Sequence, residues 1–307
     1  MLRPILTFVA ASLAAPALAQ AGAVQGTDCQ LRINPAPASW IITGYDPFAE
    51  ALPEGTFSVT FVNEGGAECR FMPLFDLSEP PFGLSKGTGK PVGYALLNLT
   101  DTQDVTPRSG RTQRISSQRE VVLQPKESRS MLYKLVANPE DVRNAGIFTQ
   151  RVTLEAQDSN FRSLMGTDIV LGVTVLPSVR IGLAGAYRMN NGQAVVKLGE
   201  LKEGASPTQL QLHVRSTAEY DISVSSANSG RLRLGSSQWF VPYSVVIDNK
   251  SFNLNGVETL SSSSGSSRSA RSQNSLDILP FQFIIGDVSN RRAGVYSDVL
   301  SVSVTAR

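Results

Sequence analysis

The sequence predicts an all-β protein of two tandem antiparallel β-sandwiches, the second of which lacks its final strand. Three observations lead to this prediction. Short runs rich in Val, Leu, Thr and Ser alternate with Gly, Pro, Asn and Asp, and no segment has a sustained apolar stripe of helical period. Three segments of the first half recur in the second half. The last strand-like run ends the 307-residue sequence, whereas its earlier counterpart is followed by another strand.

The internal repeat consists of matching segments at near-equal spacing. The matching pairs are residues 57–71 with 210–224, residues 92–98 with 241–248, and residues 145–149 (Ala-Gly-Ile-Phe-Thr) with 293–297 (Ala-Gly-Val-Tyr-Ser). Tyr94 precedes Gly146 by 52 positions, and Tyr243 precedes Gly294 by 51. This spacing favours two domains of one fold over chance similarity between strands, although strands use few residue types.

The closing run predicts the incomplete fold. Its apolar side chains alternate with polar ones up to the end of the sequence, which is typical of a half-buried strand. We expect Tyr296, Leu300, Val302 and Val304 to lie on the inner face of that strand and to line an open groove. The matching run of the first domain continues into the strand-like residues 169–175. We therefore expect the first domain to take its final strand from residues 168–176 of its own chain.

The first nineteen residues have the pattern of a secretory signal peptide. Arg3 is followed by an apolar stretch at residues 5–15 and by the small-x-small sequence of residues 17–19. This apolar stretch is too short to span a bilayer. The sequence thus predicts an exported protein whose mature chain divides into domains at 20–176 and 177–307, with a short junction near Pro177.

Cysteine usage and charge limit the remaining function classes. Cys29 and Cys69 both lie in the first domain, and in an oxidising compartment such a pair is expected to form a disulfide. The second domain has no cysteine and must be stable by packing alone. The net charge of the precursor is +2 with dispersed basic residues, so a nucleic-acid partner is not expected. Polar loops are expected at residues 101–119 and 261–275.

No catalytic or metal-binding constellation is recognisable. His213 is the single histidine and lies within an alternating run, where no nucleophile accompanies it. Residues 83–87 match G-x-S-x-G, but Pro80 and Pro81 precede them and further glycines follow, so a loop is favoured over a nucleophile elbow. Cysteines engaged in a disulfide cannot form a zinc site. We therefore expect no enzyme activity, no metal and no cofactor.

Several short motifs resemble one family of secreted proteins. They are Cys29, Gly44-Tyr45-Asp46-Pro47, Cys69, Val241-Pro242-Tyr243 and the closing run from Ala293 to Asp298. Together they resemble bacterial pilus subunits of the archaic chaperone–usher type, whose domain is named after spore coat protein U. The second domain departs from the family because it lacks the cysteine pair. The resemblance implies an immunoglobulin-like sandwich without its last strand, which a periplasmic chaperone completes first and the neighbouring pilus subunit completes later.

The resemblance also implies partners and a location. A periplasmic chaperone, an outer-membrane usher and a neighbouring subunit are expected, with passage through the periplasm into an extracellular fimbrium. Residues 20–28 offer only Ala21, Ala23 and Val24 as apolar side chains, too few for a donor strand. An acceptor without a donor is expected at the pilus tip, as an adhesin for an unknown surface or glycan. The alternatives are a periplasmic chaperone, whose class residues 121–125 and 131–135 resemble, and a secreted carbohydrate-binding sandwich.

Adhesion is assigned to loops of the first domain. Residues 72–75 and 80–84 place apolar side chains in turn-forming sequence. If they are exposed, Phe75, Phe82 and Leu84 can dock on apolar surfaces or stack on sugars. Buried loop anchors are the alternative interpretation.

Overall fold

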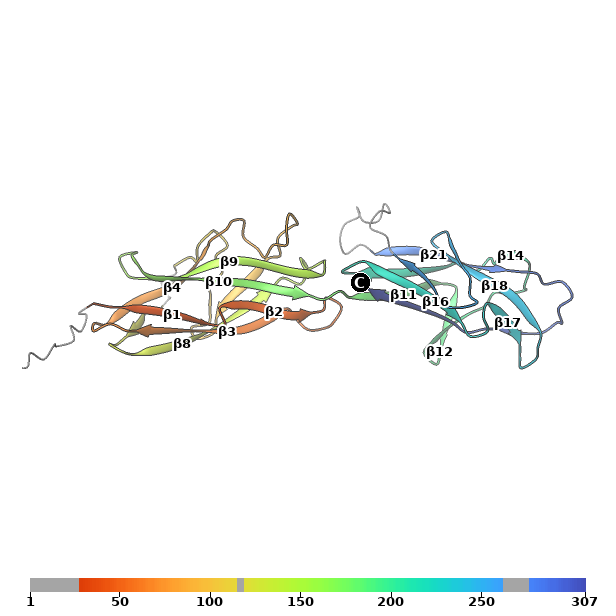
Figure 1. Cartoon of the computed structure of the whole chain (residues 1–307), viewed down its shortest axis with the longest axis horizontal. Helices are drawn as coiled ribbons and strands as arrows, with labels where there is room; N and C mark the ends of the chain where they lie inside the picture. The colour runs from red at the N-terminus through yellow and green to blue at the C-terminus, as the bar shows by residue number, and fades with distance from the viewer. Residues whose placement is uncertain (1–27, 115–118, 262–275) are drawn as a thin grey trace, which may run out of the picture.

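The structure is a computed structural model that describes residues 28–114, 119–261 and 276–307, and these residues form strands and turns without a helix. The predicted all-β fold is therefore confirmed. The predicted signal peptide, residues 20–27 and residues 262–275 lie outside the described residues. In Figure 1 two β-rich domains follow one another, joined by residues 176–178 between β10 (Ser163–Val175) and β11 (Val179–Gly185). The described part of the chain has no helix that is long and apolar enough to cross a membrane.

The first domain is a sandwich of two five-stranded sheets. One sheet has the order β1 (Leu31–Ala36), β3 (Glu54–Asn63), β8 (Ser128–Ala137), β5 (Tyr94–Asn98) and β6 (Gln103–Asp104). The other has the order β2 (Ser39–Tyr45), β10, β9 (Gly146–Gln157), β4 (Cys69–Leu77) and β7 (Val121–Leu123). β10 therefore lies between β9, with which it pairs antiparallel, and β2, with which it pairs parallel.

Aromatic rings fill the centre of the first sandwich. Trp40 is fully buried and stacks on Phe57 and Tyr133, with ring centroids 5.4 and 5.6 Å apart. Its indole N–H donates a hydrogen bond to the carbonyl of Pro37, so its one polar group is satisfied. β10 adds Ile169, Leu171 and Val173, all fully buried, to this core. The period-two pattern of β10 in the sequence thus matches its burial.

The second domain has one large sheet and one small sheet. The large sheet has the order β11, β15 (Leu210–Ser216), β21 (Asp277–Ile285), β18 (Phe240–Ile247), β17 (Arg231–Leu234) and β22 (Tyr296–Ser297), with β14 (Gly204–Ala205) beside β21 and β19 (Lys250–Phe252) beside β18. The small sheet has the order β20 (Glu258–Ser261), β16 (Tyr220–Ser226) and β23 (Leu300–Ala306). A separate hairpin is formed by β12 (Tyr187–Asn190) and β13 (Gln193–Val196).

The strand orders of the two domains correspond. The order β1-β3-β8-β5-β6 of the first domain recurs as β11-β15-β21-β18-β19, and β7-β4-β9 recurs as β20-β16-β23. Tyr94 and Tyr243 open equivalent segments of β5 and β18, as the sequence repeat predicts. The correspondence does not extend to β10 and β2. No described strand of the second domain occupies their places in the small sheet.

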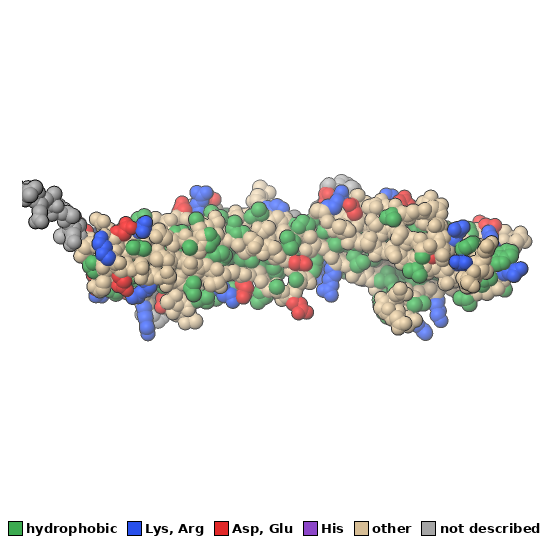
Figure 2. All heavy atoms as spheres, turned by 60° about the horizontal axis from the view of Figure 1, so that its bottom comes forward, with side chains coloured by type: hydrophobic (Ala, Val, Ile, Leu, Met, Phe, Trp, Pro, Cys, Tyr) green, Lys and Arg blue, Asp and Glu red, His purple; other side chains and the backbone are tan. Residues whose placement is uncertain are grey.

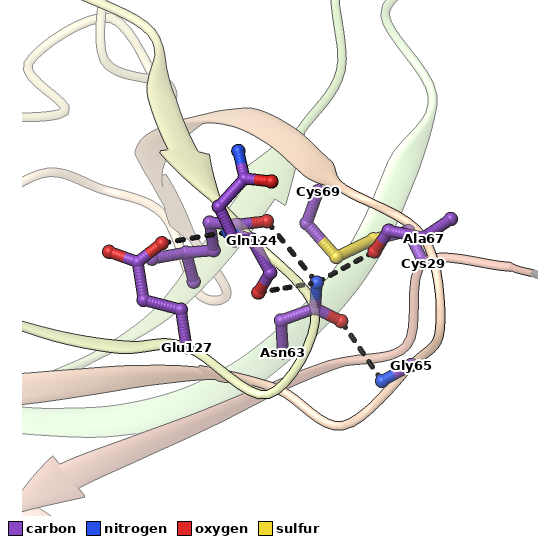
Figure 3. The surroundings of a disulfide bond; sticks show 8 residues. Cys29, Asn63, Gly65, Ala67, Cys69, Gln124 and Glu127 are labelled. Carbon is purple, nitrogen blue, oxygen red and sulfur yellow. Dashed lines mark hydrogen bonds between the residues drawn. A yellow bond between two sulfur atoms is a disulfide. The ribbon is translucent and has the colours of Figure 1, made fainter.

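The end of the first domain opposite the junction is held by a disulfide and a buried amide (Figure 3). Cys29 and Cys69 are joined, with their Cα atoms 5.1 Å apart. The Asn63 side chain is fully buried and donates hydrogen bonds to the carbonyls of Ala67 and Leu123 at 2.7 and 3.2 Å. Its Oδ1 accepts from the backbone N–H of Gly65 at 2.9 Å. These bonds tie the turn after β3 to the segment after β7.

Charges of both signs are interspersed on one face of the molecule. On the face shown in Figure 2, Lys and Arg side chains are scattered among Asp and Glu side chains along both domains. Several of these charges pair across neighbouring strands, such as Arg111 with Glu155 at 2.8 Å and Lys134 with Glu54 at 2.7 Å. Exposed pairs of this kind contribute little to the free energy of unfolding.

Candidate strand-acceptor groove

β23 is an edge strand with one unpaired side. It pairs antiparallel with β16 from Leu300 opposite Ser226 to Ala306 opposite Tyr220. No described strand pairs with its other edge. In an antiparallel strand every second residue directs its N–H and C=O away from the paired neighbour, so a row of backbone donors and acceptors faces outward here. Such a row can be satisfied by a further strand.

The inner face of β23 is only partly covered. Leu300, Val302 and Val304 are half-buried, and the serines between them are exposed. Their counterparts in β9 are Val152, Leu154 and Ala156, each with no exposed surface. β9 differs from β23 in having β10 beside it. We therefore infer that the side chains of β23 are more exposed than those of β9 because no described strand lies beside β23 in the place of β10.

The opposite wall of the groove belongs to the large sheet. β11 lies next to β23, and Val179 and Leu183 are partly buried against the second core, while Ile181 is 43% exposed. Among the described residues, twelve hydrophobic side chains lie partly buried at the margin of the second core, against five at the first. The second core is thus open along one side, where the first is closed by β10.

Tyr296 does not belong to the groove strand. The sequence predicts one continuous strand that includes it, whereas the structure has two strands separated at residues 298–299. Tyr296 is still partly buried against the second core, as are the three apolar side chains of β23. Tyr296 lies in β22, which pairs with β17 in the large sheet, and its hydroxyl donates to the carbonyl of Arg292 at 2.9 Å. The inner face of β23 is formed by Leu300, Val302 and Val304.

Asp298 lies at the break and accepts hydrogen bonds from neighbouring segments. Its carboxylate accepts hydrogen bonds from the hydroxyl of Tyr243 at 2.7 Å, from the backbone N–H of Asn228 at 3.1 Å and from the hydroxyl of Ser226. Burial and the neighbouring carboxylate raise the pKa of Tyr243 above its usual value. The sequence does contain a signal for this role, since Asp298 is the polar residue in the inward phase of an otherwise apolar alternation.

The first domain uses a neutral residue at the same position. Gln150 corresponds to Asp298 and is buried. Its Oε1 accepts from the backbone N–H of Gly83 at 3.0 Å, and its Nε2 donates to the carbonyl of Pro81 at 2.8 Å. At equivalent positions of the two domains a polar side chain therefore forms hydrogen bonds to the backbone of a neighbouring loop.

We expect Asp298→Ala to lower the free energy of unfolding of the second domain by about 2–3 kcal/mol, because it leaves partly buried donors without an acceptor. Calorimetry of the mature chain measures this change as an earlier second-domain transition, with the first-domain transition as internal reference. Asp287→Ala is the matched control, since Asp287 bonds only locally to Ser289 and we expect a change within about 0.5 kcal/mol. Equal effects of the two variants would contradict the assignment.

Two of the three predicted adhesive residues of the first domain are fully buried. Phe75 lies within β4, not in a loop, and is fully buried against Trp40 and Tyr133. Leu84 is also fully buried, and Phe82 packs on Tyr94 with ring centroids 4.7 Å apart. The loop prediction is therefore wrong for Phe75 and Leu84, which the alternative of buried anchors describes, whereas Phe82 is only partly buried.

The residues considered as catalytic or metal-binding candidates lie apart from one another in the structure. His213 lies on β15 within 3.4 Å of the Gln211 amide oxygen. Ser85 of the G-x-S-x-G match forms a β-bridge with Thr149, and its hydroxyl donates to the carbonyl of Gly83. The described residues contain no group of three or more His, Cys, Asp or Glu side chains that could hold a metal ion.

Comparisons with known proteins find similarity at the level of structure. No protein-family model matches the sequence, and no curated protein is similar to it. One similar solved structure is the CsuC–CsuE chaperone–tip adhesion subunit pre-assembly complex from archaic chaperone–usher Csu pili of Acinetobacter baumannii, with 14% identity over 89% of this chain and 99% of that chain and a TM-score of 0.46. Another is the CupB6 tip adhesin from Pseudomonas aeruginosa, with 12% identity, 90% and 94% coverage and a TM-score of 0.39. A third is CfaE, the adhesive subunit of CFA/I fimbria of enterotoxigenic Escherichia coli, with 12% identity, 87% and 92% coverage and a TM-score of 0.34.

Proposed function

We propose that the chain is an exported subunit of a bacterial pilus whose second domain is completed by a β-strand from another polypeptide. The observation that carries this proposal is the difference between β9 and β23. One strand is buried beside β10, whereas its counterpart has half-buried apolar side chains and an edge with which no described strand pairs. A free edge next to an open core is costly in water, and strand addition relieves both costs at once.

The first domain indicates what the added strand must offer. β10 presents four inward side chains at alternate positions, Ile169, Leu171, Val173 and Val175, and each is at most 2% exposed. It runs antiparallel to β9. A partner strand of the same pattern, running antiparallel to β23, fits the groove. In the proposed assembly pathway a periplasmic chaperone lends such a strand first and a neighbouring subunit replaces it after passage through the usher.

The proposal places the chain at the pilus tip. It accepts a strand through its second domain, and residues 20–28 carry too few apolar side chains to donate one. The first domain already contains its own final strand and is free to act as the adhesive unit. Its binding surface then lies outside the buried side chains Phe75 and Leu84.

Substitutions on the two faces of β23 test strand completion in a bacterium that displays the protein. We expect Val302→Lys to abolish surface display, because it places an unpaired charge against an apolar groove, which costs about 3–5 kcal/mol. That cost corresponds to strand binding weaker by about 100-fold or more. Immunolabelling of intact cells measures display, and immunoblotting of the periplasm measures the amount exported.

Ser303→Lys is the matched control, since the same side chain is then placed on the outward face of the same strand. We expect this variant to be displayed like the parent chain. Normal display of Val302→Lys, or equal loss with both variants, would count against completion of the groove by a partner strand.

A further inference from the structure

A cavity of about 360 Å³ lies between the two domains, and no residue of β23 lines it. The first domain contributes residues 47–50, between β2 and β3, and Val142 and Arg143, between β8 and β9. The second domain contributes Arg180 from β11 and Arg215 from β15. Pockets of this size accommodate small ligands such as one or two sugar rings.

The cavity carries an excess of positive charge. Arg180 and Arg215 are directly opposite one another in the antiparallel pair of β11 and β15, an arrangement that destabilises a sheet. Neither they nor Arg143 forms an ion pair with a described acidic residue. Glu50 is the single acidic residue among those that line the cavity. Three arginines against one carboxylate leave a site that an anionic group would neutralise.

Apart from Thr217, the rest of the lining is apolar and partly aromatic. Pro47, Phe48 and Ala49 lie on one side, and Pro139 and Val142 on another. Guanidinium groups bind carboxylates and sulfates through paired hydrogen bonds, whereas aromatic and proline side chains offer flat apolar surfaces. A saccharide that bears an acidic group presents both kinds of surface, because its ring has apolar C–H faces.

Hydrogen bonds connect the two walls of the cavity. The backbone N–H of Ala145 in the first domain donates to the carbonyl of Thr217 in the second at 2.7 Å. The Thr217 hydroxyl donates to the carbonyl of Leu176 at 2.9 Å and accepts from the backbone N–H of Ser178 at 2.8 Å. Thr217 itself is buried. These bonds hold the domain connection beside the arginines, so that a ligand would meet a preformed site.

We propose that this cavity binds an acidic saccharide, with the carboxylate or sulfate between Arg143, Arg180 and Arg215 and a sugar face toward Phe48. The like-charged pair is then a functional feature whose repulsion is relieved on binding. The proposal does not depend on completion of the second domain, because β23 does not line the cavity.

Calorimetric titration of the mature chain tests the site with a disaccharide of glucuronic acid and N-acetylgalactosamine as the probe. We expect saturable binding that weakens as salt is added, because the contact is ionic and exposed. Arg180→Gln with Arg215→Gln should weaken binding about tenfold or more, because charge-assisted hydrogen bonds are lost. Glu50→Gln should strengthen binding, because it removes a like charge facing the ligand.

Controls distinguish this site from general charge effects and from unfolding. The double variant Arg151→Gln and Arg188→Gln removes two exposed charges outside the cavity and should bind like the parent chain. The Arg180 and Arg215 variant should melt at the parent temperature or higher, because a repulsive pair is gone. Absence of binding, equal binding of the uncharged disaccharide, or equal binding of inorganic sulfate alone would each overturn the saccharide site.

Discussion

Fusing residues 158–175 after Arg307 should raise the melting temperature of the second domain by about 10 °C or more. These residues are the hairpin turn and the final strand of the first domain, so the fusion supplies to β23 the neighbour that β9 already has. Burial of each large apolar side chain of that strand contributes about 1.5–3 kcal/mol, and ordering the strand offsets part of this sum. Each net kcal/mol moves the midpoint of a domain of this size by several degrees.

The measurement is calorimetry of the mature chain with and without the fused segment, in which the first-domain transition serves as internal reference. The matched control carries the same segment with Ile169, Leu171, Val173 and Val175 replaced by serine in the fused copy only. Backbone pairing remains available to that control, whereas its side chains cannot fill the groove. A control that melts as high as the apolar fusion would show that the groove needs no apolar strand, and identical transitions in all three chains would remove the basis of the incomplete fold.

Hydrogen exchange gives the same prediction a local readout. The backbone amides on the outer edge of β23 should exchange rapidly in the unfused chain and become protected in the fusion, since exchange follows local opening and exposure. The amides of β9 should be protected in both. Protection confined to β23 would distinguish completion of the groove from a general stabilisation of the chain.

The sequence predicted those features in which side-chain period follows burial. Leu300, Val302 and Val304 alternate because one face of their strand meets a core, and Ile169, Leu171 and Val173 alternate for the same reason. The internal repeat supplied the comparison that makes the missing strand visible. The fold class and the open edge of the final strand could therefore be predicted from the sequence alone.

Features that depend on strand register or on tertiary contacts could not be predicted from the sequence. Phe75 follows a proline in a turn-like sequence, yet it is the partner of Trp40 at the centre of the first core. Arg180 and Arg215 are far apart in the sequence and become neighbours only through the register of β11 and β15. The hairpin of β12 and β13 follows β11 at the place where β2 follows β1 in the first domain, and the sequence analysis predicts no such hairpin. The alternation also continues through residues 298–299, so it does not reveal that Tyr296 lies in a separate strand, β22.

Replacing Cys29 and Cys69 by serine should lower the free energy of unfolding of the first domain by about 4 kcal/mol, the value that the chain-entropy model gives for a closed loop of this length. The bridge spans 40 positions and joins the segment before β1 to the first residue of β4. Because the second domain has no cysteine, its transition should not move. Two transitions in one calorimetric scan therefore measure the effect and its control together.

The buried amide next to the bridge provides the contrasting variant. Asn63→Ala keeps the disulfide but removes the donor to Ala67 and Leu123, so buried carbonyls lose their partner at a cost of about 1–3 kcal/mol. Reductant should destabilise the parent and the Asn63→Ala chain by similar amounts and leave the serine variant unchanged. If reductant moved neither transition of the parent chain, the bridge would have no role in stability and the amide network alone would hold this end of the domain. If it moved the second-domain transition as well, the two domains would unfold as one unit, and the reasoning for a separately completed second sandwich would fail with it.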